Sequence, residues 1–207
     1  SAIALIGCKK PNEAPAGSAS VAPPPAAASA AAPASEKTAD VQTPQAFDIN
    51  RIPVSTAALG DFPYFKLPAG YSSKGFSTTN KRFARFPFWV DGQTHWVEGQ
   101  FYGATFSNEP GHDFSILEAT RNFDAMVQQM GGVKVSEGKV PTEEIKRWGD
   151  EITLGFVAGL GDVYNDPVKT YVIRRGEGNI WLHLVTTSAN GAYVVGREKA
   201  FEQTAQL

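Results

Sequence analysis

The stretch "SILEATRNFDAMVQQMG" (residues 115–131) decides the fold class, because it contains both ends and the apolar face of one helix. Ser115 and Glu118 have the spacing of a capping box, and Gly131 suits the position just after a helix C-terminus. Apolar side chains recur at helical spacing, at Ile116, Ala119, Phe123, Met126, Val127 and Met130. The sequence therefore predicts one main amphipathic helix at about 115–130, packed on a core.

Alternating segments on both sides of this helix predict antiparallel hairpins. Before it, "RFARFPFWVDG" (82–92) has the alternation of a strand and ends in Asp-Gly, a two-residue turn signal. The return strand is expected at about 94–106, where Gly99 and Gly103 suggest a bulge or close packing. Further strands are expected within 131–141, 168–175, 180–187 and 189–201, with a short helix at 142–149 and a hairpin signal at Asn190-Gly191.

These elements together predict the architecture of residues 47–207. Hairpins that precede and follow a single well-marked helix are typical of an α+β fold with an antiparallel sheet. We expect one domain, with the helix at about 115–130 packed on one face of the sheet and a short second helix nearby. The aromatic, proline-containing segment 62–71 is expected to be an ordered loop against the sheet.

Composition excludes several classes of function. The formal net charge of −2 gives no electrostatic reason to expect nucleic acid as a partner. The single cysteine cannot form an intramolecular disulfide, and His95, His112 and His183 are far apart in the sequence. The common phosphate-binding, serine-hydrolase, zinc-protease and dinucleotide motifs do not occur in the sequence. The sequence predicts no enzymatic activity, no cofactor and no metal site.

The single cysteine lies in "LIGCKK" (5–10), where Leu5 to Cys8 resemble the lipobox of bacterial lipoprotein signal peptides. A buried structural cysteine is the alternative. From residue 11 to 35, 21 of 25 positions are Ala, Pro or Ser, a composition typical of a disordered tether. We therefore expect a signal-peptide remnant at 1–7, lipid attachment at Cys8 and a tether over 8–46. Lys9 follows the cysteine, which by the enterobacterial sorting rule favours the outer membrane.

Candidate ligand-binding residues are few. Tyr64, Arg82, Arg85 and Trp96 combine exposed aromatic and basic character, as in binding modules for glycans, although a solvated strand face is the alternative. His112-Asp113 resembles half of a catalytic relay, but a role for Asp113 in helix capping or in compensating the helix dipole is simpler. Gly159-Leu160-Gly161 lacks the lysine of a phosphate loop. No catalytic residue is assigned from the sequence.

Five segments resemble the N-terminal region of OmpA-family outer-membrane lipoproteins of Gram-negative bacteria. They are "LGDFPYFKLPAGY", "RFARFPFWVDGQTHWVEGQFY", "LEATRNFDAMVQQMGGVKVSEGKVP", "TYVIRRGEGNIWLHL" and "GAYVVGREKAF", within residues 59–201. The resemblance implies an envelope location and a non-enzymatic role. The peptidoglycan-binding domain that commonly follows in that family has no matching positions up to Leu207, so its ligand residues are not carried over.

These observations lead to three functional hypotheses. The first is an outer-membrane lipoprotein, tethered through Cys8, whose domain has a structural or partner-binding role and is a plausible antigen. The second is a binding module for peptidoglycan or another glycan, and the third is an envelope hydrolase built on His112-Asp113. The expected partners are membrane lipid through Cys8 and an envelope protein or peptidoglycan, with no nucleic acid. The sequence leaves open which face of the outer membrane the domain occupies.

Overall fold

The computed structural model of the protein describes residues 47–205. The signal-peptide remnant at 1–7, the lipid-attachment residue Cys8 and the tether at 8–46 lie outside the described residues. The strands are β1 (Tyr71–Ser72), β2 (Thr78–Val90), β3 (Gln93–Asn108), β4 (Val133–Gly138), β5 (Val168–Ile173), β6 (Ile180–Thr186) and β7 (Gly191–Glu198). The helices are α1 (Ile116–Gln129), α2 (Thr142–Trp148), α3 (Asp150–Thr153), α4 (Val157–Leu160) and a 3-10 turn, η1 (Ile49–Arg51).

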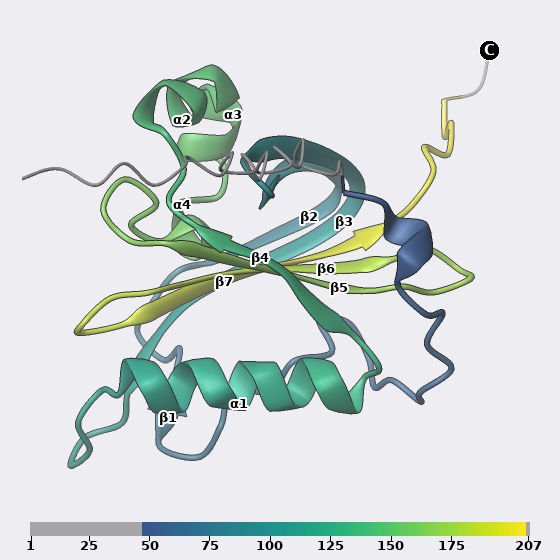
Figure 1. Ribbon diagram of the computed structural model, residues 1–207. Helices are drawn as coiled ribbons and strands as arrows, with labels where there is room; N and C mark the ends of the chain where they lie inside the picture. The colour runs from purple at the N-terminus through teal and green to yellow at the C-terminus, as the bar shows by residue number, and fades with distance from the viewer. Residues whose placement is uncertain (1–46, 206–207) are drawn as a thin grey trace, which may run out of the picture. The chain divides into compact units, whose positions relative to one another are not determined.

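The strands form one antiparallel sheet in the order β1-β3-β7-β6-β5-β4, and β2 also pairs with β3. Three hairpins join neighbours in the sequence, β2–β3, β5–β6 and β6–β7, whereas β3 and β7 pair across the rest of the chain. Figure 1 shows α1 on one side of the sheet and α2 to α4 on the other. The predicted α+β class and antiparallel sheet are confirmed.

The main helix forms where its sequence signals predict it. Ser115 is the N-cap, and its side chain accepts a hydrogen bond of 3.2 Å from the backbone nitrogen of Glu118. Gly131 follows the helix with a φ of 73°, the left-handed conformation expected there. The core-facing side chains Ala119, Phe123 and Val127 are buried, but Ile116 is 43% exposed and lies outside the buried face. Of the two roles expected for Asp113, capping is wrong, because Ser115 occupies the N-cap position.

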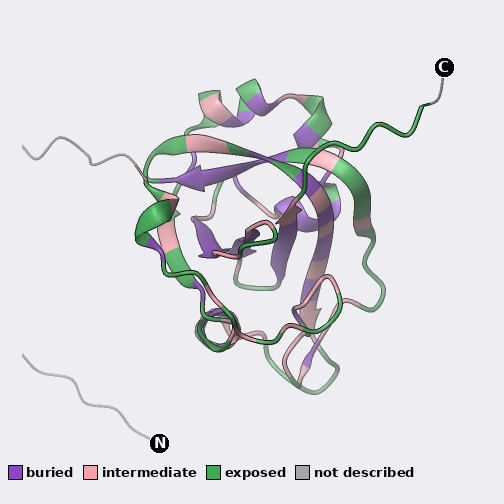
Figure 2. Cartoon of the chain, turned by 90° about the vertical axis from the view of Figure 1, so that its right-hand side faces the viewer, coloured by how far each residue is buried: buried purple, intermediate pink, exposed green. Residues whose placement is uncertain are grey.

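Both faces of the sheet are covered: α1 packs on one face, as predicted, and the β2–β3 hairpin with α2 to α4 covers the other (Figure 1). Every residue of β5 and β6 is buried, because side chains alternate between two cores. Ile180, Leu182 and Leu184 pack on the α1 side, whereas Trp181 and Val185 pack on the side of α2 to α4. Figure 2 shows these central strands buried and much of the outer hairpin exposed.

The β2–β3 hairpin is long enough to curl over the second face of the sheet. Its turn is Asp91-Gly92, with φ values of 47° and 80°, as the Asp-Gly signal predicts. The tip reaches the opposite edge strand, since the backbone nitrogen of Asp91 donates to the Ser136 hydroxyl of β4 at 3.2 Å. Thr170 of β5 donates to the carbonyl oxygen of Trp89 at 2.7 Å. The hairpin thus covers the core on the side of α2 to α4.

Gly99 and Gly103 lie where the chain packs closely, as predicted. A side chain at Gly99 would lie 2.0 Å from the carbonyl oxygen of Arg197, and one at Gly103 would lie 3.2 Å from the Cα atom of Gly159. The β6–β7 hairpin is confirmed, but its turn is residues 187–190 rather than Asn190-Gly191. Gly191 instead begins β7, where the Phe106 ring leaves no room for a side chain.

Arg174 and Arg175, at the end of β5, hold the first described segment against the sheet. The Arg174 guanidinium donates to the carbonyl oxygens of Asn50 and Ile52, each at 3.0 Å. Arg175 donates to the carbonyl oxygen of Ala57 at 2.6 Å. These bonds fix the entry of the chain at the end of β5. Among residues 47–205, none of the helices has the length and apolar character that crossing a membrane requires.

Candidate functional site

One end of the sheet's α1 side extends beyond the buried core. Directly opposed residues of neighbouring strands point to the same face of a sheet. Gln100 of β3 lies opposite Arg197 of β7, and Arg197 lies opposite Ile180 of β6. Ile180 belongs to the core on the α1 side, whereas Gln100 and Arg197 are only partly buried. On this face of the sheet, the side chains therefore change from apolar at Ile180 to polar at Arg197 and Gln100.

Two adjoining hollows form a groove on this polar surface, which we call the strand-end groove. The larger has a volume of ≈ 680 Å³ and is lined by β3, the β5–β6 turn and the end of β7. The smaller has a volume of ≈ 270 Å³ and is lined by the loop 59–64 and the same turn. Both include Glu177, Gly178 and Arg197, so the groove is continuous.

Trp96 forms an aromatic wall of the strand-end groove. Its side chain is 40% exposed, and the Arg85 guanidinium carbon lies 4.6 Å from the ring centroid. Arg85 also forms an ion pair of 2.9 Å with Glu151 of α3, and this hydrogen bonding raises the pKa of the guanidinium. The pair is solvent-exposed and adds little stability. Its effect is to orient Arg85 over one face of the indole.

A hydrogen-bonded layer supports the groove from the protein interior. Glu198 accepts hydrogen bonds from Asn179 at 2.7 Å and from the indole nitrogen of Trp181 at 3.0 Å. His95 stacks on Trp181 with ring centroids 4.7 Å apart. Burial lowers the pKa of His95, and the Glu198 carboxylate partly opposes that shift. The carboxylate of Glu198 is therefore occupied by internal partners.

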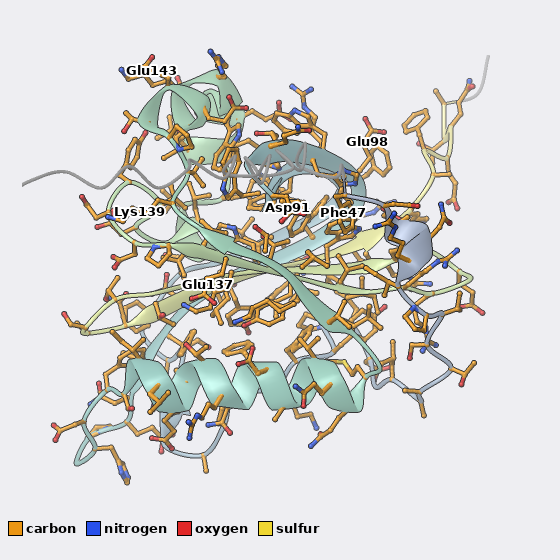
Figure 3. The ribbon with its side chains drawn as sticks, viewed as in Figure 1. Phe47, Asp91, Glu98, Glu137, Lys139 and Glu143 are labelled. Atoms are coloured by element: carbon orange, nitrogen blue, oxygen red, sulfur yellow. The ribbon has the colours of Figure 1, made fainter. Side chains whose placement is uncertain are left out.

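Other charged groups along the groove keep their binding capacity free. Glu98, Glu177 and Arg197 make no ion pair or side-chain hydrogen bond with any residue of 47–205, and Gln100 makes no side-chain hydrogen bond there. Figure 3 shows Glu98 on the outer side of the curled hairpin. The groove thus offers a carboxylate, an amide and a guanidinium beside an exposed indole. Such a set donates and accepts hydrogen bonds at fixed positions along a strand.

Of the four candidate residues from the sequence, two line the groove and the others lie next to it. Tyr64 lies in the smaller hollow, where its ring packs edge-on against Phe62 at 5.5 Å. Trp96 lies in the larger hollow with Arg85 stacked on it. Arg82 lines a third hollow of ≈ 520 Å³, which adjoins the groove through the shared residues Lys199 and Ala200.

The remaining candidates lie elsewhere. His112 is exposed and lines none of these hollows, and no hydrogen bond joins it to the Asp113 side chain within the described range. His183 is buried, and its Nε2 donates to the carbonyl oxygen of Leu160 at 2.9 Å. Gly159 packs against the sheet rather than in an open loop. Trp89, Trp148 and Trp181 are buried core residues.

No sequence pattern marks the polar residues of the groove itself, which are Glu98, Gln100, Glu177 and Arg197. Only strand register shows that Gln100 and Arg197 are neighbours, because they are 97 positions apart in the chain. Within residues 47–205, no three His, Cys, Asp or Glu side chains come together in a way that could hold a metal ion.

Comparisons of the chain with models of protein families, with curated protein sequences and with solved structures gave no match.

Proposed function

We propose that the protein is a lipid-anchored envelope protein of the outer membrane whose domain is a non-catalytic binding module for peptidoglycan or a related glycan. The observation that carries this proposal is the strand-end groove, in which Trp96 stands beside the unpaired groups of Gln100, Glu177 and Arg197. The lipobox-like Cys8 and the OmpA-family resemblance support the envelope location.

The shape of the groove favours a polymer over a small enclosed ligand. Small-molecule sites are usually concave, mostly apolar and largely buried. The strand-end groove is open, polar and long, and it runs from Tyr64 to Lys199 through two hollows. A glycan strand presents hydroxyl, amide and carboxylate groups along its length, and these match amide, carboxylate and guanidinium side chains in a row.

Binding to purified sacculi tests the groove directly. We expect the full chain with Cys8→Ala to be retained at low salt, and Gln100→Ala/Arg197→Ala to weaken retention about tenfold or more, because charged hydrogen bonds are the strong ones. Trp96→Ala should also weaken it. The matched control is Arg121→Ala/Leu154→Ala, which removes an exposed cation and an exposed apolar side chain outside the groove.

Equal retention of the groove variant and the control would exclude the groove as the glycan site. Absence of retention of the unsubstituted chain at low salt would exclude the glycan itself. Thermal unfolding of each variant should stay close to that of the parent, since the changed side chains are exposed or half-buried.

Fatty-acid labelling tests the anchor separately. Cells that express the protein should incorporate a radiolabelled fatty acid into it, and Cys8→Ala should abolish the label, because the thiol is the expected attachment atom. The reference is a Ser18→Ala protein, which changes the Ala- and Pro-rich segment and leaves the thiol in place. Label that persists in Cys8→Ala would show that Cys8 is not the attachment site.

A further inference from the structure

A second surface lies beside the groove and has a different chemistry. We call it the β2 patch, and it consists of Lys81, Arg82, Phe83, Lys199 and Phe201. The two phenylalanine rings are 39% and 71% exposed and pack edge-on against each other at 5.5 Å. Large aromatic side chains exposed as a pair outside a core often mark an interaction site.

The cations of the patch are largely uncompensated. Lys81 and Arg82 make no ion pair with any residue of the described range, whereas Lys199 pairs with Glu202 at 3.1 Å. The patch therefore has a positive charge around two exposed rings. The overall chain is slightly acidic, with a formal charge of −2, so the positive charge of the patch is a local excess.

Backbone geometry presents these side chains to solvent. The pairing of β2 with β3 shifts register between Lys81 and Ala84, so Arg82 and Phe83 lie in a bulge. The first half of β2 is exposed or half-buried, and only residues 86–90 enter the core. A bulge with lysine on an edge strand opposes the addition of another strand, which argues against a peptide partner at this edge.

The patch lies at the end of the domain where the described chain begins. Phe47 packs on His95 and Trp181, and Trp181 hydrogen-bonds to Glu198 at the end of β7. The chain continues from Glu198 into the segment that includes Phe201. Figure 1 shows η1 and the C-terminal segment at this same end.

We infer that the β2 patch docks on a bilayer that contains anionic phospholipid. Phe83 and Phe201 enter the boundary between headgroups and acyl chains, and Lys81 and Arg82 pair with lipid phosphates. Aromatic side chains with flanking cations are the combination that favours this interface. The inference uses no property of the strand-end groove.

Co-sedimentation with lipid vesicles tests this inference. The full chain with Cys8→Ala, which has no thiol to acylate, is mixed with vesicles of neutral phosphatidylcholine or of phosphatidylcholine with phosphatidylglycerol. We expect binding to the anionic vesicles only. Lys81→Gln/Arg82→Gln should weaken it roughly 30-fold, from the loss of two cations near the surface. Phe83→Ser/Phe201→Ser should weaken it about tenfold.

Two controls match these variants. Lys66→Gln/Lys74→Gln removes two exposed cations, and Leu154→Ser/Val157→Ser removes two exposed apolar side chains, 68% and 64% exposed, outside the patch. Both should bind like the parent. Absence of binding to anionic vesicles at low salt would overturn the inference. If only the charge variant lost binding to the vesicles, the patch would adsorb without inserting its rings, which also contradicts the inference. Equal losses of binding in the patch variants and in the controls would contradict it as well. Sacculus retention should be unchanged in the patch variants, so the two proposals fail independently.

Discussion

Gly159→Val is expected to lower the free energy of unfolding by about 3–5 kcal/mol, from overpacking together with a lost buried hydrogen bond. A Cβ atom at Gly159 would lie 2.5 Å from the carbonyl oxygen of Tyr193 and 2.7 Å from the Cα atom of Gly103. Both are backbone atoms that cannot rotate away. The substitution therefore forces α4 off the sheet, and the Leu160 carbonyl that binds His183 moves with it. Urea unfolding followed by tryptophan fluorescence measures the change.

Gly176→Val is the matched control for that prediction. A Cβ atom there meets no other atom within 4 Å, and the residue has no positive φ. Its stability should lie within about 0.5 kcal/mol of the parent, as for an ordinary surface substitution. If Gly159→Val unfolds at the same urea concentration as this control, the close contact of α4 with β3 and β7 is not as the structure has it.

Acidification from pH 7.5 to 4.5 is expected to cost roughly 2–3 kcal/mol of stability through His183 alone. Burial lowers the pKa of this histidine to about 4, while in the unfolded chain it stays near 6.5. Its Nε2 donates to Leu160, and its Nδ1 has no partner among the described residues. Between the folded-state and unfolded-state pKa values, the unfolded state therefore binds more protons than the folded state. The stabilisation is complete above pH 6.5 and is lost as pH falls toward 4.

The variant His183→Gln isolates this contribution, because an amide can still donate to the Leu160 carbonyl but does not titrate. Its unfolding free energy, measured in urea at pH 7.5, 6.5, 5.5 and 4.5, should fall by roughly 2–3 kcal/mol less than that of the parent. A weaker dependence of the unfolding free energy on pH should remain in this variant because of His95, whose pKa is also lowered by burial. Parallel profiles for His183→Gln and the parent would refute the assignment.

Local signals made much of the fold predictable. The capping box at Ser115 and the glycine at 131 mark the ends of α1, and Asp91-Gly92 marks the β2–β3 turn, because each feature acts within a few residues. The helices α3 and α4 were not predicted, since each is only four residues long and is held by packing on the sheet. The second covered face was missed because the length of the β2–β3 hairpin does not show where it curls.

The candidate site was predictable only in its aromatic and basic members. Trp96 and Arg85 are conspicuous residues, and their proximity follows from pairing across one hairpin, where Arg85 lies opposite Glu98. Gln100 and Arg197 meet through β3–β7 pairing, which joins distant parts of the chain. Gln100 and Arg197 are accessible because the loop 59–64 and α1 do not cover this end of the sheet. No local pattern encodes that boundary.

The most direct test of the proposed function is a ¹H–¹⁵N NMR titration of the full chain with Cys8→Ala, using soluble disaccharide-peptides released from peptidoglycan. Binding in the strand-end groove predicts that amide shifts change at 96–100, 177–178 and 197–200, and that residues of α1 and of α3 to α4 keep their positions. Spectra that stay unchanged at millimolar fragment, or shifts that cluster on another surface, would contradict the account.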